Sequence, residues 1–286
     1  MSVDFEAAKD LMLREARLLD RTRFAFRFGD GTATAVLAAL TPYQNEDGGF
    51  GNALEPDLRG PSSQPVPVEH ALAILDEIGR FDARIVGLTC DWLSSVSTED
   101  GAVPFVLRTV ADGPHAPWWE PTGRGSLNPT AGIAGLLHKG AVAHPWRTAA
   151  TAYCWNALPE NIPSLGQDDT ISVVTFLDHV PDRARAEEVF SVLGERIRNE
   201  LVALDPDAEG YVKMPLDYAP RQDSLARRLF DDATIELHLD ALESRQQDDG
   251  GWPITWEPPS TAAVSEWRGF HTLRVLTILD DYGRLA

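Results

Sequence analysis

The heptapeptide Gln44–Phe50 (QNEDGGF) returns about two hundred residues later as Gln246–Trp252 (QQDDGGW). Each copy is followed by a loop rich in proline and serine and then by an apolar segment with helical spacing. Self-similarity of this kind is typical of a chain built from stacked repeats, in which each unit buries its apolar face against a neighbour. The pair therefore predicts a repeat architecture, although an architecture alone specifies no reaction.

Two weaker variants of the turn extend the repeat, at Glu99–Ala102 and at Asp207–Tyr211. Between the turns, apolar residues recur at helical spacing, and period-two alternation never persists. No stretch has the composition of an interdomain linker, so we expect one all-α domain of five to six helical hairpins over residues 1–286. The expected helices cover 5–19, 32–40, 68–78, 84–95, 130–138, 145–157, 169–179, 184–204, 231–244 and 265–282.

The turn residues have a structural explanation. Gly48 and Gly250 permit positive φ, which lets a chain end a helix and reverse tightly. The aspartate before each glycine pair can accept hydrogen bonds from backbone N–H groups of the turn. Phe50 and Trp252 are expected to fill the space between neighbouring hairpins. We therefore expect the turns to be structural.

The composition excludes several classes of partner. The chain has 286 residues, 43% hydrophobic content and a formal net charge of −19. That charge disfavours nucleic acid and anionic membranes, which need a basic surface. The segment Met1–Arg14 lacks the features of a secretory signal, and no apolar run is long enough to span a membrane. Cys90 and Cys154 are too few for a disulfide framework, so we expect a cytoplasmic protein with reduced thiols. The oligomeric state stays open.

The pattern Gln-x-x-Asp-Gly-Gly-Phe/Trp, with its Ser62–Gln64 loop and following apolar helix, resembles the QW repeats of the terpenoid cyclase and protein prenyltransferase superfamily, as in squalene cyclases. The resemblance implies an α/α toroid, with inner and outer helices around a cavity that binds a small hydrophobic molecule, such as an isoprenoid. It also implies that the turn glutamines are clamps and not catalysts. Three segments resemble a bacterial branch that has no firmly established activity, namely Asn52–Arg59, Ser126–Lys139 and Glu266–Leu276.

The segment Gly166–Ile171 (GQDDTI) resembles the Asp-x-Asp-Asp-Thr-Ala motif of class II terpene cyclases, which protonate an alkene or epoxide. The resemblance implies that Asp168 is the proton donor and Asp169 its partner. Carboxyls crowded in an apolar cavity cannot all ionise, so one stays protonated. However, Gly166 replaces the first aspartate of the motif. The alternative is that both carboxylates cap the helix that begins near Thr170.

A second carboxyl pair, Asp231-Asp232, also stands at an expected helix start and supports the capping alternative. Tryptophans are the next candidates, because indole faces in a cavity can stabilise carbocations or stack on sugars. Trp118 and Trp119 lie in a long inter-helix loop, and Trp256 and Trp267 lie near the last helix. We expect them to contact substrate, the alternative being packing between hairpins.

Two further groups are candidates for substrate binding. Glu55 and Asp57 follow the first turn together with Arg59, which predicts either a loop ion pair or a polar group at the cavity mouth. The Phe270-His271-Thr272 segment resembles the end of the prenyltransferase zinc site. Because a zinc site needs about three protein ligands and the other ligands are absent, we expect no metal and no cofactor. His271 is then a helix side chain or a substrate contact.

The leading hypothesis is a terpene-cyclase-like toroid that starts cyclisation or isomerisation by proton transfer. The chain lacks the Asp-Asp-x-x-Asp run of class I terpene synthases, a Gly-rich phosphate loop and a nucleophile elbow. One alternative is a non-catalytic binding or scaffold member of the fold. Another is a carbohydrate-active α/α barrel with acids on opposite walls of an open groove.

Overall fold

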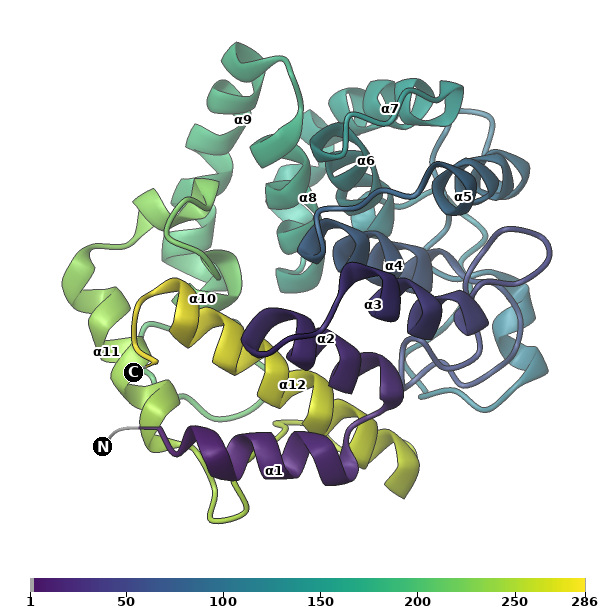
Figure 1. The fold of residues 1–286 in the computed structure, drawn as a ribbon. Helices are drawn as coiled ribbons and strands as arrows, with labels where there is room; N and C mark the ends of the chain where they lie inside the picture. Colours follow the sequence, from purple (N-terminus) through teal and green to yellow (C-terminus); the bar gives the residue numbers. More distant parts are fainter. Residues whose placement is uncertain (1–2, 286) are drawn as a thin grey trace. The chain divides into compact units, whose positions relative to one another are not determined.

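The computed structural model describes residues 3–285 and shows an all-α protein (Figure 1). Within these residues the only β-type pairs are isolated bridges, which confirms the predicted fold class. No helix in this part of the chain combines the length and apolar character needed to cross a membrane. The α-helices are α1 (Phe5–Glu15), α2 (Leu18–Phe28), α3 (Ala33–Leu40), α4 (Pro65–Glu77), α5 (Ala83–Val96), α6 (Leu127–Lys139), α7 (Pro145–Asn161), α8 (Gln167–His179), α9 (Arg183–Arg196), α10 (Pro215–Tyr218), α11 (Asp232–Ser244) and α12 (Thr261–Asp281).

Shorter helical turns join some of these helices. The turns η1, η2, η3 and η5 are 3₁₀ helices, and η4 is a π-helical turn that continues α9. Their bounds are η1 (Thr41–Tyr43), η2 (Arg108–Asp112), η3 (Ile162–Ser164), η4 (Ile197–Leu201) and η5 (Leu225–Leu229). The expected helix over 184–204 therefore changes character at its C-terminal end.

The helix expected over 5–19 is two helices, and this prediction was wrong. Ala16 and Arg17 are extended (ψ 153° and 154°), and α2 begins at Leu18. The expected helices left residues 20–31 unassigned, although α2 extends to Phe28. In the structure, Asp20 is fully buried and forms ion pairs with Arg17 (2.7 Å) and Arg23 (3.0 Å). Two polar residues of α2, Asp20 and Arg23, are therefore part of the interior.

The chain divides into two compact units. Unit 1 combines the residues up to Ala39 with those from Ile197 onward, and unit 2 comprises Leu40–Arg196. The closure of all hairpins into a single toroid over 1–286 stays a prediction.

In unit 2, helix α6 packs against both α4 and α8, and α7 also packs on α6. Glycines permit the close approach: a Cβ atom at Gly135 would lie 2.6 Å from the Thr175 carbonyl oxygen of α8. In unit 1, α1, α2 and α12 pack against one another. Near the C-terminus, Arg284 is held by three carboxylates of α11, those of Glu236, Asp240 and Glu243.

The two near-copies of the turn have the same backbone structure. Asn45 N–H donates to the Gly49 carbonyl (2.9 Å), and Gln247 N–H donates to the Gly251 carbonyl (2.8 Å). Gly48 and Gly250 have φ of 93° and 91°. The aromatic side chains that end the two turns, Phe50 and Trp252, are each 1% exposed. The predicted structural role of the turns is confirmed by these contacts.

Each turn also rests on a helix. A Cβ atom on Gly48 would lie 2.4 Å from the Leu88 oxygen of α5, and one on Gly250 would lie 2.2 Å from the Ala7 carbon of α1. Of the two weaker turns, the one at Glu99–Ala102 behaves in the same way, because a Cβ atom on Gly101 would lie 2.8 Å from the Ala149 side chain of α7. The other differs, because a Cβ atom on Gly210 would have no atom within 4 Å. Packing of a glycine corner on a helix is thus shared by three of these four turns.

Candidate functional site

The predicted acid pair lies in the first turn of α8. Asp169 occupies the third helical position, and its carboxylate accepts a hydrogen bond from the Gly166 backbone N–H (3.0 Å). This is the capping contact that the alternative interpretation of the pair predicted. Asp168 is exposed. Neither aspartate therefore has the water-excluded setting that the acid hypothesis requires.

An open pocket of about 590 Å³ adjoins this end of α8. Backbone pairing builds its wall: Pro104 and Gly125 form an antiparallel bridge, and Ser126 N–H donates to the Val103 carbonyl (3.0 Å). Phe105 is the apolar side chain of the lining, and its ring contacts that of Trp119 at a tilt, with ring centroids 5.0 Å apart. The pocket is lined by Phe105, Thr122, Arg124, Gly125, Ser126 and Asp169.

A second carboxyl, Glu69 of α4, lies where α4, α6 and α8 meet. The Ser172 hydroxyl of α8 lies 3.1 Å from Glu69 Oε1 and 3.4 Å from Asn128 Oδ1. Gly132 of α6 leaves the necessary space, because a Cβ atom there would lie 1.6 Å from Glu69 Oε1. The three helices thus form a seat for one carboxyl group, which we call the Glu69 site and define as Glu69, Asn128, Gly132 and Ser172.

The electrostatics of the Glu69 site favour the protonated acid. Desolvation of its carboxyl raises the pKa of Glu69 to about 7, the Ser172 hydrogen bond lowers it, and the negative charge of Asp168 raises it further. Burial disfavours the ionised form of a carboxyl because the low-dielectric interior solvates charge poorly. Glu69 can therefore both donate and accept a proton near neutral pH.

The Glu69 site and the open pocket share the same part of α8. Ser172 follows Asp168 by four positions and Asp169 by three, so all three side chains lie near one face, with Cβ atoms of neighbours about 5–6 Å apart. On α6, Asn128 is two positions from Ser126, which lines the pocket. Glu69, Asn128, Gly132 and Ser172 themselves are not among the residues that line the pocket.

Sequence reasoning missed Glu69. The available signal was a lone acid within the apolar run of α4, where Val66, Val68, Ala71 and Leu72 are all buried. Glu69 itself is only partly exposed, and a charged residue beside so many buried apolar ones is unusual unless it is paired or functional.

The other predicted residues of unit 2 are not brought to the pocket together. Trp118 is 47% exposed, whereas Trp119 is 7% exposed and belongs to an apolar cluster with Leu58 and Val110. Glu55 and Asp57 are both buried. The Asp57 N–H donates to Glu55 Oε2 (2.9 Å), so this loop is organised by its own carboxylate.

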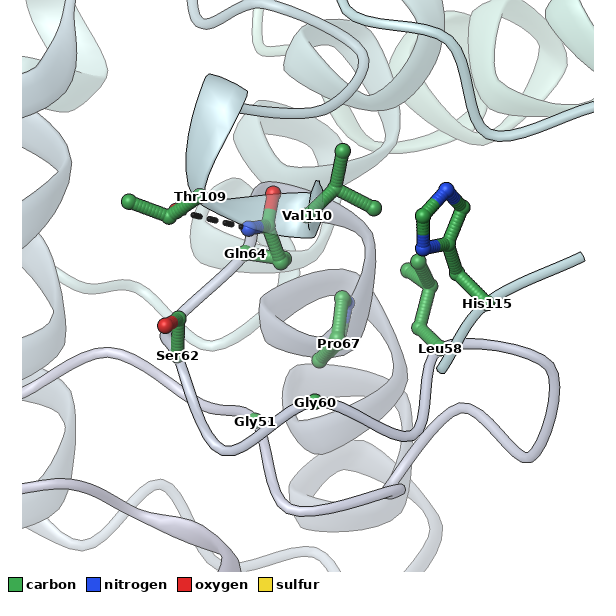
Figure 2. A pocket seen from close by; sticks show the side chains of 9 residues that line it. All are labelled: Gly51, Leu58, Gly60, Ser62, Gln64, Pro67, Thr109, Val110 and His115. Carbon is green, nitrogen blue, oxygen red and sulfur yellow. Dashed lines mark hydrogen bonds between the residues drawn. The ribbon is translucent and has the colours of Figure 1, made fainter. Parts of the chain in front are cut away.

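Figure 2 shows the small cavity next to that loop. Gln64 donates to the Thr109 hydroxyl (2.9 Å) and accepts from Leu107 N–H (2.7 Å), which ties the loop to η2. The cavity measures about 10 Å³, which is about the space of a single water molecule. It cannot hold a metabolite, and its residues are structural.

The remaining candidates belong to unit 1 and form an aromatic cluster. Trp256 lies edge-on to Trp267 with centroids 5.0 Å apart, and Trp267 lies edge-on to Phe270 at 5.4 Å. Burial lowers the pKa of His271 to about 4, with a smaller contribution from Arg274 in the same direction. His271 is therefore neutral near pH 7. Within residues 3–285, no three His, Cys, Asp or Glu side chains are placed to hold a metal ion.

Comparisons with known proteins support the fold. The structure is similar to that of a protein from Actinoplanes solved by crystallography, with 17% identity, a TM-score of 0.62 and coverage of 97% of this chain and 98% of that one. No protein-family model matches the chain, and no curated protein matches it in sequence. At this identity the likeness concerns the fold alone.

Proposed function

We propose that the chain is a terpene-cyclase-like enzyme that binds a small hydrophobic molecule, an isoprenoid being the first to test. In this proposal, proton transfer starts cyclisation or isomerisation, as in class II cyclases. The observation that supports it is the open pocket of about 590 Å³ beside the first turn of α8, which Phe105 and Asp169 help to line. Pockets of this size accommodate drug-sized ligands.

The proposal includes the cellular setting. Cys90 and Cys154 are buried and unpaired, as expected of thiols in a reducing compartment. We place the protein in the cytoplasm and expect neither nucleic acid nor a membrane as its partner.

Native mass spectrometry tests the proposal with two panels of compounds, one of isoprenoid alkenes and alcohols and one of oligosaccharides. The variant Thr122→Trp fills the pocket from its exposed rim, and Thr261→Trp is the matched control at an exposed position of unit 1. We expect isoprenoid binding to the wild type and to Thr261→Trp, and at least a tenfold loss of affinity in Thr122→Trp. Binding of oligosaccharides alone would favour a carbohydrate-active protein, and binding of neither panel would favour a scaffold.

A further inference from the structure

Two polar side chains that line the open pocket have no partner in the part of the chain that the structure describes. Arg124 and Ser126 both belong to the lining. Within residues 3–285, neither the Arg124 guanidinium nor the Ser126 hydroxyl forms a hydrogen bond or an ion pair. Both groups can donate hydrogen bonds, and a guanidinium also carries a permanent positive charge. The pocket therefore offers uncommitted donors to a molecule that enters it.

The uncommitted hydroxyl of Ser126 is unusual for its position. Ser126 immediately precedes α6, where a serine side chain ordinarily caps the helix by accepting from a backbone N–H. Here the side chain makes no capping contact. Asn128, two residues on, has the extended backbone that a following proline favours (φ −97°, ψ 118°), which opens the first turn of α6. Pairing of Ser126 N–H with the Val103 carbonyl (3.0 Å) holds the residue in the wall.

The same pocket has an apolar side chain whose position is well supported. Phe105 lines the pocket, and its ring contacts that of Trp119 with centroids 5.0 Å apart. Trp119 is itself buried in a cluster with Leu58 and Val110. An aromatic ring held in this way offers a large apolar surface to a ligand. Donors and apolar surface in one pocket suit a molecule with an acceptor group at one end and an apolar body.

The charges of the lining decide which acceptor group fits. Arg124 is the one cation among the lining residues, and Asp169 is the one anion. The Asp169 carboxylate is held in place because it accepts a hydrogen bond from Gly166 N–H (3.0 Å). A carboxylate matches the planar guanidinium and brings a single negative charge, whereas a phosphate monoester brings about −1.5 to −2. With Asp169 in the wall and a net charge of −19 on the chain, additional negative charge on a ligand is disfavoured.

We infer that the pocket binds an amphipathic monocarboxylate, with its carboxylate on Arg124 and Ser126 and its apolar body on Phe105. This inference rests on the proposed function, for which it names the class of ligand. The Arg124 guanidinium forms an ion pair with the carboxylate, and the Ser126 hydroxyl donates to it. Asp169 selects against ligands with more than one negative charge.

Calorimetric titration with three compounds that share one isoprenoid chain tests the acceptor group. Geranic acid carries a carboxylate, geraniol a neutral hydroxyl and geranyl phosphate a phosphate. We expect geranic acid to bind the wild type at least about tenfold more tightly than geraniol at low salt, because hydrogen bonds to a charged group are stronger. It should also bind more tightly than geranyl phosphate. High salt should weaken the binding of geranic acid and leave that of geraniol unchanged.

Arg124→Gln removes the positive charge from the lining. Because the guanidinium has no partner within residues 3–285, we expect this variant to fold as the wild type does. It should lose at least about tenfold in affinity for geranic acid and keep its affinity for geraniol. Arg84→Gln is the matched control, since Arg84 is exposed on α5 of the same unit and does not line the pocket. The control should retain both affinities.

Two further variants test the other assigned roles. Ser126→Ala should weaken the binding of geranic acid by about three- to tenfold and leave that of geraniol unchanged. In Asp169→Asn, the amide oxygen can still accept from Gly166 N–H, so the start of α8 is kept. Removal of this negative charge should strengthen the binding of geranyl phosphate more than that of geranic acid. The opposite order would contradict the role of Asp169.

The outcomes separate the inference from the proposed function. Equal binding of geranic acid and geraniol by the wild type, or equal loss in Arg124→Gln and Arg84→Gln, would overturn the inference and leave a pocket for neutral apolar molecules. Tighter binding of geranyl phosphate than of geranic acid would overturn the assignment of a monocarboxylate. If none of the three compounds binds the wild type, the proposed function fails and the inference fails with it.

Discussion

The turns at Gln44–Phe50 and Gln246–Trp252 have the same backbone conformation, but the aspartates of the two turns bind different side chains. Asp47 and Asp249 each accept a hydrogen bond from the N–H of the second glycine, at 2.9 and 3.1 Å. Outside the turn, Asp47 accepts from the neutral Ser63 hydroxyl (2.7 Å), whereas Asp249 pairs with the Arg268 guanidinium of α12 (2.8 and 2.9 Å). The turn itself thus requires aspartate and glycine, while the outer partner of the aspartate can vary.

The glutamines show the same division. Gln44 and Gln246 each donate to the carbonyl of the first glycine, at 3.0 and 2.9 Å. Gln44 also donates to the Ile85 carbonyl of α5 (3.1 Å). Gln246 instead holds Asp4, accepting from its N–H (2.8 Å) and donating to its carbonyl (2.9 Å). One glutamine therefore joins adjacent hairpins of unit 2, and the other joins the beginning and the end of the chain within unit 1.

Replacing the first glycine of either turn is expected to give the largest effect. In Gly48→Ala and Gly250→Ala, the new Cβ would meet helix backbone within 2.4 Å, at a φ that alanine disfavours. The strain of positive φ, about 1–2 kcal/mol, adds to overpacking of about 1–3 kcal/mol. We expect each substitution to lower the free energy of unfolding by roughly 2–5 kcal/mol, measured by denaturant unfolding.

Gly79→Ala and Gly283→Ala are matched controls, one in each unit. Both glycines have positive φ (62° and 71°), but an added Cβ would have no atom within 4 Å. These variants keep the backbone strain without the collision, so they should lose only about 1–2 kcal/mol. Equal losses in all four variants would show that the contact with the helix contributes nothing.

These turns could be predicted because their determinants are local. Glycine at positive φ and aspartate beside it follow from the sequence itself, and the repetition of the motif indicates that its setting is repeated too. The ends of α5 and α11 were also predicted closely, since apolar spacing and an aspartate cap mark them. The break between α1 and α2 was missed because the extended backbone at Ala16 and Arg17 follows no glycine or proline that would mark it in the sequence.

The Glu69 site lay beyond sequence reasoning because tertiary contacts assemble it. The protonation of Glu69 follows from the packing of α4 against α6, the missing side chain at Gly132 and the position of Ser172 on α8. These residues are separated by about a hundred positions and form no motif. Asp168 and Asp169 were candidates because their segment resembles the class II cyclase motif, yet at the start of α8 Asp168 is exposed and Asp169 makes a capping contact.

Replacing the turn glutamines is expected to lower the stability by an intermediate amount, and by different amounts in the two turns. Gln44→Ala deletes hydrogen bonds in a partly buried place, where the carbonyls left behind cost about 1–3 kcal/mol. Gln246→Ala exposes the Asp4 backbone groups, which can then bind water. We therefore expect it to lower the free energy of unfolding by about 1 kcal/mol or less. Hydrogen exchange should accelerate at the start of α1 in Gln246→Ala only. Faster exchange at the start of α1 in Gln44→Ala would contradict the conclusion that Gln44 and Gln246 act in separate units.

The smallest loss of stability should come from replacing the side chains that bind the aspartates from outside each turn, Arg268 and Ser63. The Arg268 hydrogen bond, followed in importance by the Gly251 N–H bond, lowers the pKa of Asp249. A lowered folded pKa contributes stability above the ordinary value of 3.8 that is lost as pH falls through the folded value. Because the pair is partly exposed, Arg268→Gln should cost less than about 1 kcal/mol at neutral pH, and high salt should reduce that cost. Ser63→Ala removes a neutral partner, so its cost should be independent of salt. A salt-dependent cost in Ser63→Ala, or a salt-independent one in Arg268→Gln, would show that the two turns do not differ in the charge of their partners.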